Sequence, residues 1–320
     1  MVRGKRWLAG LTGAIVAVAF TPLLAQSPHR QQLADKFQAE LQRLADAEAG
    51  VAGISVVDLA SGQRFGVNDQ LVFPQGSAIK IPILIELFHR ADRGDLRLTD
   101  RVPVRAADRV GGSGLLQHFS DGASELSLHD LAIPMIVLSD NLATNLLIDR
   151  LGMEHVSETM ASLGAPQTRL QRKMIRPEES VKGNENLSTP REAADLMARL
   201  ARCDLPISAR SCAEVKRILE IPKGGPFREP IPPSVRVAWK PGAIEGVQTA
   251  WALVGVPDGA YAIAIMVNYG ADDMSSTLRE TSAAAYRYFS QIARTTSHGV
   301  RVPFEHIRKQ SGSKHEGGRE

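Results

Sequence analysis

Hydrophobic residues recur at helical spacing in several segments of this chain. In residues 31–49, Leu33, Phe37, Leu41 and Leu44 fall on one face of a helix, which predicts an amphipathic helix. The same kind of pattern predicts helices over 77–90, 127–138, 142–151, 153–163, 190–202 and 276–293. The segment 77–90 is strongly apolar.

Strand-like patterns occur near both ends of the chain, with turn residues between them. They cover 51–59, 63–67, 235–239, 249–256 and 261–268. The simplest packing forms one sheet from both chain ends and leaves the middle helices as a second lobe, which predicts an α/β (α+β) fold. Residues 167–188 are polar and long for a loop, so they are either functional or disordered, and residues 311–320 read as a solvated tail.

Composition and charge narrow the function classes. The 320 residues are 43% hydrophobic and 23% charged, which is typical of a globular protein and excludes disordered and collagen-like chains. The formal net charge is +3, and residues 1–25, with three cations and no acid, account for all of it. No basic block occurs elsewhere, and aromatic residues are few, so a nucleic-acid binder is excluded.

The first segment predicts export. Arg3, Lys5 and Arg6 precede an apolar run that ends at Ala25, which is typical of a secretory signal peptide over residues 1–25. The alternative is an uncleaved membrane anchor, because the run is close to spanning length. No cysteine follows the run and no Arg-Arg pair precedes it, so neither a lipoprotein nor the twin-arginine route is indicated. We expect a periplasmic or secreted protein.

Two cysteines, Cys203 and Cys212, lie nine residues apart. In an oxidising compartment they can form a disulfide, and the alternative is two separate buried thiols. The eight histidines show no metal-ligand spacing, so we expect no metal site.

The segment Ser77-Ala78-Ile79-Lys80 is the first candidate for chemistry. A serine at a helix start and a lysine three residues later share one face, so the amine can reach the hydroxyl. The helix N-terminus favours negative charge on the serine oxygen, and burial would lower the pKa of Lys80 until it accepts a proton. The pattern alone is weak, because residues 311–314 also match it within the polar tail.

Two further segments carry candidate residues. In Ser139-Asp140-Asn141 the hydroxyl can pass a proton to a leaving group and the amide can hold a substrate amide, although all three residue types also cap helices. Lys240-Pro241-Gly242 follows a strand pattern. There the ammonium can meet a substrate carboxylate and Gly242 permits close backbone approach, although Pro-Gly also encodes a turn. Lys223 begins a similar Lys-x-Gly triplet in a loop rich in proline and glycine.

The three segments together resemble the SxxK, SDN and Lys-Thr/Ser-Gly motifs of penicillin-recognising serine hydrolases. Their separations, 62 and 101 residues, are similar to those of the class A β-lactamase family. The helix around residues 138–147 and the segments 168–170 and 188–190 also resemble that family. The resemblance extends over residues 30–295.

This resemblance implies a β-lactamase/transpeptidase-like fold, in which helices flank an antiparallel sheet and an all-helical lobe covers about residues 90–225. Ser77 would attack a lactam or amide carbonyl, Lys80 would transfer protons, and Ser139 would protonate the leaving nitrogen. The N–H groups of Ser77 and Ala243 would form the oxyanion hole. Asn141, Lys240 and Gly242 would position the substrate. The resemblance implies no metal and no organic cofactor, and it implies a β-lactam or cell-wall peptide-like small molecule as partner. We expect a monomer that binds neither nucleic acid nor, after cleavage, a membrane.

The chain departs from the family in two places. The E-x-x-x-N motif, whose Glu activates the deacylating water, falls on Met174 and Glu178 when counted from Thr168, and on Lys173 and Pro177 when counted back from Pro190. Neither register supplies the acid.

Three outcomes follow from the missing acid. Glu178, or its neighbour Glu179, acts as a substitute base, Lys80 acts alone, or the acyl-enzyme persists. The second departure, Pro241, removes a hydroxyl and a backbone donor, which only an edge strand or a free N–H position tolerates. We therefore expect a secreted serine hydrolase of the class A β-lactamase type. The alternatives are a D-alanyl peptidase or esterase that uses the same serine, and a penicillin-binding acyl trap without turnover.

Overall fold

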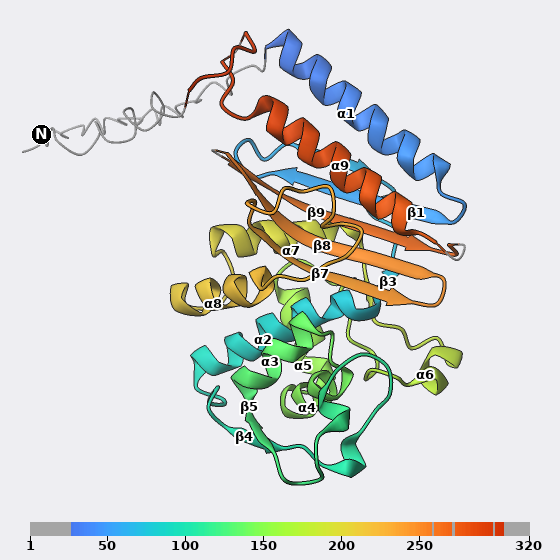
Figure 1. Ribbon diagram of the computed structural model, residues 1–320, viewed down its shortest axis with the longest axis vertical. Coiled ribbons are helices and arrows are strands. Elements are labelled where there is room, and N and C mark those ends of the chain that lie inside the picture. Colours follow the sequence, from blue (N-terminus) through green and yellow to red (C-terminus); the bar gives the residue numbers. More distant parts are fainter. Residues whose placement is uncertain (1–26, 258, 271–272, 297, 304–320) are drawn as a thin grey trace, which may run out of the picture.

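A computed structural model describes residues 27–257, 259–270, 273–296 and 298–303 (Figure 1). The predicted leader, residues 1–25, and the predicted tail, residues 311–320, lie outside the described residues.

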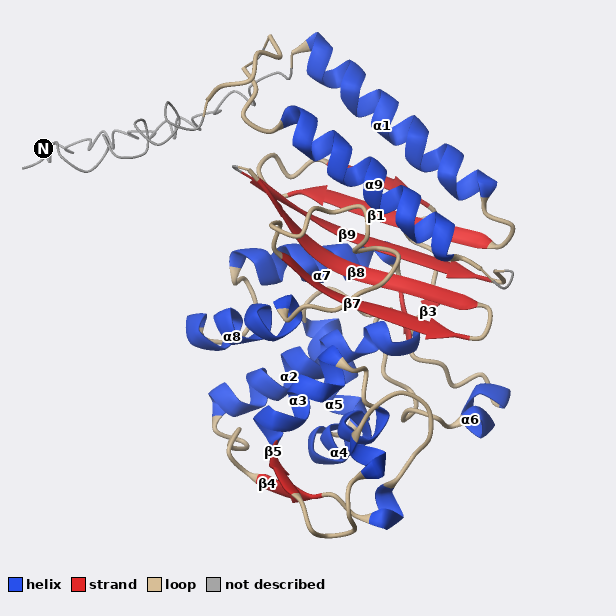
Figure 2. Ribbon diagram, in the orientation of Figure 1, coloured by secondary structure: helices blue, strands red, loops and turns tan. Residues whose placement is uncertain are grey.

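A five-stranded antiparallel sheet forms the middle layer (Figure 2). Its strands are β1 (Val51–Asp58), β2 (Arg64–Val67), β7 (Val237–Ile244), β8 (Val247–Val256) and β9 (Gly259–Asn268), in the order β2-β1-β9-β8-β7. Strand β1 pairs with β9 from Val51 opposite Asn268 to Asp58 opposite Tyr261. Both chain ends therefore build one sheet, which confirms the prediction, and β7 lies at its edge.

Two helices, α1 (Pro28–Ala47) and α9 (Ser275–Ile292), cover one face of the sheet (Figure 1). Aromatic rings hold them there: Phe37 of α1 stacks on Tyr288 of α9 with centroids 4.5 Å apart, and Phe289 stacks on Tyr261 of β9 at 4.3 Å. Leu33, which the helical pattern places on the buried face, is instead 37% exposed, and Ala34 is buried in that turn.

The remaining helices lie on the other side of the sheet, and this layer holds the larger apolar core. These helices are α2 (Lys80–Arg93), α3 (Leu128–Val137), α4 (Asn141–Leu151), α5 (Met153–Ser162), α6 (Pro177–Val181), α7 (Pro190–Arg202) and α8 (Ala209–Glu220). Helix α7 contacts β1 and β9, while α2 to α5 form the helical lobe beyond it (Figure 1). No described helix is long and apolar enough to cross a membrane.

Short elements complete the fold and connect its layers. Strand β3 (Phe73–Pro74) pairs with β6 (Leu187–Ser188), and β4 (Arg101–Pro103) pairs with β5 (Glu125–Ser127). The 3₁₀ turns are η1 (Gly76–Ile79), η2 (Ala106–Asp108) and η3 (Leu116–His118). The pattern over 77–90 predicts a helix that begins at Ser77, whereas the α-helix begins at Lys80 and Ser77 lies in the tighter turn before it.

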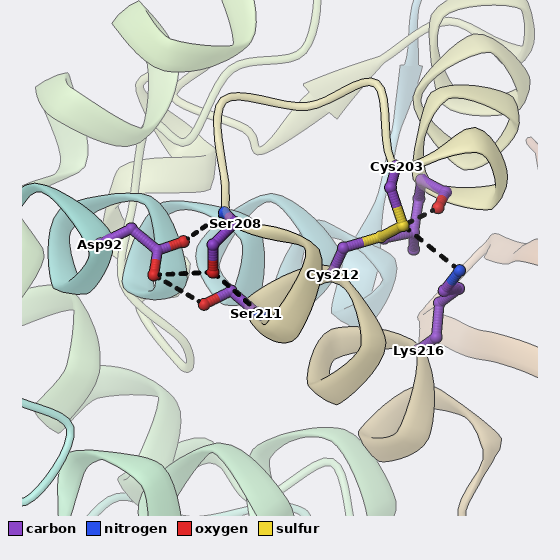
Figure 3. Close-up of a disulfide and its surroundings, with 7 residues drawn as sticks. Asp92, Cys203, Ser208, Ser211, Cys212 and Lys216 are labelled. Carbon is purple, nitrogen blue, oxygen red and sulfur yellow. Dashed lines mark hydrogen bonds between the residues drawn. A yellow bond between two sulfur atoms is a disulfide. The ribbon is translucent and has the colours of Figure 1, made fainter.

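A disulfide joins Cys203, the C-cap of α7, to Cys212 in α8, with Cα atoms 5.7 Å apart (Figure 3). The two cysteines therefore form a disulfide and are not two separate buried thiols. Beside it, the Asp92 carboxylate accepts from the backbone N–H and hydroxyl of Ser208 and from the Ser211 hydroxyl. The disulfide and these bonds together fix the start of α8 against α7 and α2.

Candidate active site

Ser77 lies in η1, where the chain packs directly against β7. A Cβ atom on Gly242 of β7 would lie only 2.8 Å from the backbone nitrogen of Ala78, and one on Gly76 would lie 3.0 Å from that of Ala243. Gly76 also has a φ of +50°, which favours glycine. Because both positions lack a side chain, the backbones of the Ser77 turn and of Ala243 come into contact.

The buried side chain of Gln75 fixes the turn before Ser77. Its Oε1 accepts from the indole Nε1 of Trp251 at 2.8 Å, and its backbone oxygen accepts from Thr249 Oγ1 at 2.9 Å. Its backbone nitrogen donates to Asn186 at 2.8 Å. The turn is thus held between β8 and the loop that precedes α7. The sequence patterns did not single out Gln75, since a lone glutamine carries no motif.

Lys80 begins α2 and is completely buried. Its Nζ donates to the backbone oxygen of Ser139 at 2.8 Å, to Ser139 Oγ at 3.0 Å and to Asn141 Oδ1 at 3.1 Å. Burial lowers the pKa of Lys80 to about 7, although the charge of Asp140 opposes this shift. The lowered pKa makes the uncharged amine of Lys80 accessible near neutral pH, and such an amine accepts a proton.

Lys240, on β7, approaches Ser139 from the other side. Its Nζ donates to Ser139 Oγ at 3.1 Å and to the backbone oxygen of Pro241 at 2.9 Å. Burial lowers the pKa of Lys240 well below its ordinary value, and the charges of Lys80 and Lys223 lower it further. Ser139 Oγ accepts from both amines, which occupies its two lone pairs and leaves its own proton for a third group.

The Ser139-Asp140-Asn141 segment contains the helix cap considered for it and also contacts Lys80. Asp140 caps α4, since its carboxylate accepts from the backbone of Ala143 at 2.9 Å. The same carboxylate accepts from the backbone nitrogens of Leu115 and Leu116. Ser139 has a φ of +53°, a strained conformation of the kind that occurs at functional sites. The cap therefore positions the two neighbours that contact Lys80.

Lys240-Pro241-Gly242 lies within β7 and forms no turn; the turn follows at Gly246, which has a φ of +70°. Because β7 is the edge strand, Pro241 is tolerated there. Lys223, three residues after the end of α8, donates to the backbone oxygens of Leu219 and Ile221 at 2.7 and 3.0 Å. Although it belongs to a different segment, its charge acts on Lys240.

A cavity of about 680 Å³ opens in front of Ser77. Among its lining residues are Ser77, Asn141, Met174, Arg176, Ala243 and Glu245. The structure thus brings the predicted residues of η1, α4 and β7 to one site. Within the described ranges, no group of three or more His, Cys, Asp or Glu side chains is arranged to hold a metal ion.

Comparisons with known proteins agree with this geometry. The family model described as Beta-lactamase enzyme family matches residues 36–289. This chain belongs to that family. A β-lactamase of Rhodobacter capsulatus is 29% identical over 181 residues, which make up 56% of this chain and 57% of the relative. The chain thus matches little more than half the length of that relative.

Solved structures match a larger share of the chain. A β-lactamase from Sphaerobacter thermophilus is 32% identical, with a TM-score of 0.72, and the match covers 79% of this chain and 96% of that one. A variant of PBP-A, solved as an acyl-enzyme complex with penicillin G, is 28% identical, with a TM-score of 0.72 and coverage of 81% and 97%. These matches show the β-lactamase/transpeptidase-like fold.

The loop over residues 167–188, which the family uses for its E-x-x-x-N motif, lies against the cavity. Asn186 anchors it by accepting from the backbone of Gln171 and Arg172 at 2.8 and 3.0 Å. Arg172 is paired with Glu185 at 2.9 Å and is nearly buried. Met174 lines the cavity and is buried, at the position that counting from Thr168 assigns to the family's Glu.

The structure does not bring Glu178 to the site. Its side chain is 55% exposed in the first turn of α6 and pairs with Arg176 at 3.6 Å, and Glu178 is not among the residues that line the cavity. Glu179 is bonded to Lys182 and Asn184. Both carboxylates therefore face partners of their own loop.

Proposed function

We propose that this chain is a serine hydrolase that opens β-lactam amides through an acyl-enzyme on Ser77. The observation that carries the proposal is the contact of Lys80 with Ser139 and Asn141, one turn beyond Ser77. This contact supports the proposal because a buried amine with a lowered pKa, three residues along the chain from Ser77, lies beside the Ser139 hydroxyl.

In the proposed reaction, the uncharged amine of Lys80 takes the proton of Ser77 as Ser77 Oγ attacks the lactam carbonyl. The backbone N–H groups of Ser77 and Ala243 stabilise the oxyanion, and loss of one such donor typically costs about 10²–10³ in rate. When the C–N bond breaks, Ser139 gives its proton to the lactam nitrogen and receives one from Lys80, 3.0 Å away. Lys80 thus returns to its uncharged form.

A long-lived acyl-enzyme is the second candidate. Where the family carries a Glu that activates water, this chain has Met174, and a thioether accepts a proton too weakly to serve as a base. Loss of a general base costs about 10²–10⁴ in rate. The related PBP-A variant, solved with penicillin G as an acyl-enzyme, supports a trap that is acylated faster than it is hydrolysed.

Mass spectrometry of the intact chain over time, with excess penicillin G, tests both candidates. An adduct that forms and disappears while product accumulates supports turnover, and an adduct that stays supports the trap. The Ser77→Ala variant is the control and should form none. If penicillin G gives no adduct but a small ester is hydrolysed, the D-alanyl peptidase or esterase alternative replaces both.

We further propose that residues 1–25 direct export and are removed. The Cys203–Cys212 disulfide supports this proposal, because disulfides persist mainly in oxidising compartments. Sequencing the N-terminus of the protein from periplasmic and medium fractions tests it. A mature chain that begins at Gln26 is expected, and a chain retained in the membrane fraction with Met1 intact would contradict it.

A further inference from the structure

The proposed leaving group lies at one end of the cavity, so the acyl part of a substrate, which stays attached to Ser77, extends toward the other end. Ser139 and Lys240 lie on the leaving-group side, and Ala243 lies three residues further along β7 at the oxyanion hole. Because a strand advances in one direction by about 3.3 Å per residue, Ile244 and Glu245 lie on the far side of Ala243 from Lys240. The acyl substituent therefore points toward Ile244, Glu245 and the loop that faces them.

Four charged residues line the cavity, and two of them satisfy each other. Arg172 donates to Glu185 at 2.9 and 3.0 Å and is only 10% exposed, so this pair maintains the loop. The other two are Arg176 and Glu245. They carry opposite charges and belong to different segments, Arg176 to the loop and Glu245 to the turn that follows β7.

The side chains of Arg176 and Glu245 are both available to bind a charged group of a ligand. The Arg176 guanidinium is half exposed, and its ion pair with Glu178 is 3.6 Å long, beyond hydrogen-bond length. Glu245 is exposed, and no ion pair or side-chain hydrogen bond ties it to the rest of the described chain. A half-exposed ion pair of this length contributes little to stability, so a ligand carboxylate can replace the Glu178 carboxylate beside Arg176.

Apolar side chains lie beside these two charges. Ile175 and Ile244 line the same cavity and are 48% and 38% exposed. They directly precede Arg176 and Glu245 in the chain. Exposed isoleucines at a cavity wall favour the methylene groups of a ligand. The wall thus suits an aliphatic chain that ends in charged groups.

The leaving-group end of the site is less suited to bind a charged group of a substrate. Lys80 and Lys240 are both buried and donate to Ser139, and Pro241 has no hydroxyl to add. Among the described residues that line the cavity, Arg176 and Glu245 are therefore the charged groups that remain available to an ionic group of a substrate.

We propose that Arg176 and Glu245 form a subsite for a zwitterionic acyl substituent, an aliphatic chain that ends in both an ammonium and a carboxylate. Arg176 would bind the carboxylate through its planar guanidinium, and Glu245 would accept from the ammonium. This subsite rests on the proposed function, because it assumes that Ser77 takes the acyl group.

Four penicillins that share one nucleus test the subsite. Their linear acyl side chains end in a methyl group, an ammonium, a carboxylate, or both charges. The measured quantity is the second-order rate constant of Ser77 acylation, followed by intact-protein mass. The zwitterionic penicillin should acylate about tenfold faster than the methyl-terminated one, equivalent to about 1.4 kcal/mol. In the Arg176→Gln variant, a terminal carboxylate should no longer speed acylation. In the Glu245→Gln variant, a terminal ammonium should no longer speed it.

A matched control and a charge reversal separate the subsite from a general charge effect. Lys182→Gln removes one cation from the same loop outside the cavity, and it should leave the relative acylation rates of the four penicillins unchanged. Arg176→Glu should make the ammonium-terminated penicillin faster than the carboxylate-terminated one. Equal rates for all four penicillins overturn the subsite alone. No adduct with any of them overturns the proposed function together with the subsite.

Discussion

The side-chain amide of Asn145 pairs with both backbone polar groups of Met174. Asn145 Oδ1 accepts from the Met174 nitrogen at 2.8 Å, and Nδ2 donates to the Met174 oxygen at 3.2 Å. Because Asn145 is buried in α4, these bonds fix the backbone of the loop against the helical lobe. Met174, which lines the same cavity as Ser77, is thus held in place through its backbone, and its side chain is not a carboxylic acid.

Met174→Glu should shorten the lifetime of the acyl-enzyme. A carboxylate at this position can activate water, and a general base contributes about 10²–10⁴ in rate. The measurement is the decay of the penicillin adduct after excess penicillin is removed. Met174→Gln, similar in size but without a base, is the control. If the Gln variant loses its adduct as quickly as the Glu variant, better packing or hydration explains the effect and general-base catalysis does not.

Glu178→Gln should leave deacylation unchanged, because the Glu178 carboxylate is half exposed and pairs with Arg176. The same adduct-decay measurement checks this expectation, with acylation measured in parallel. A loss of deacylation with acylation intact would mean that Glu178 is the substitute base and that the loop rearranges around the acyl-enzyme. Glu179→Gln, which removes a neighbouring acid bonded to Lys182, is the matched control.

Acylation should depend on pH through Lys80. Its pKa is lowered to about 7 by burial, and only the uncharged amine accepts the Ser77 proton. The acylation rate should therefore be level above this pKa and fall about tenfold per pH unit below it. Stopped-flow acylation from pH 5 to 9 measures the profile. Lys80→Arg, which stays charged, should acylate slowly across the range, and a flat profile in the wild-type chain would contradict the assignment of Lys80.

The sequence predicts the sheet and the motif residues because both depend on local patterns. Strands β1 and β9 have clear periodicity, and the motifs around Ser77, Ser139 and Lys240 are each contained in three or four residues. Their convergence in space confirms the predicted fold. The contacts of Gln75 and Asn145 were not predicted, because each joins segments far apart in the chain. The path of a loop also depends on contacts between distant segments, so the sequence alone leaves Glu178 as a candidate base, whereas in the structure its carboxylate pairs with Arg176.

Gly242→Ala should impair acylation more than it impairs folding. A Cβ atom there would meet the backbone nitrogen of Ala78 at 2.8 Å, and backbone cannot move aside as a flexible side chain can. Strand β7 must therefore shift away from the Ser77 turn, which separates the two proposed oxyanion donors. Loss of one donor costs about 10²–10³ in rate. Gly246→Ala, at a turn position where a Cβ atom meets no neighbour but φ is +70°, controls for general strain. Equal acylation by the two variants would contradict the proposed oxyanion hole.

Removing the Cys203–Cys212 disulfide should lower stability and leave the acylation rate unchanged. The bond closes a short loop between α7 and α8, and for a loop of about ten residues the chain-entropy estimate is about 2.5 kcal/mol. Urea unfolding of the Cys203→Ser/Cys212→Ser double variant measures the loss. The wild-type chain in reductant should show the same loss, whereas reductant should not affect the double variant. An unchanged unfolding midpoint would show that the Asp92 bonds to Ser208 and Ser211 are enough to hold α8 in place.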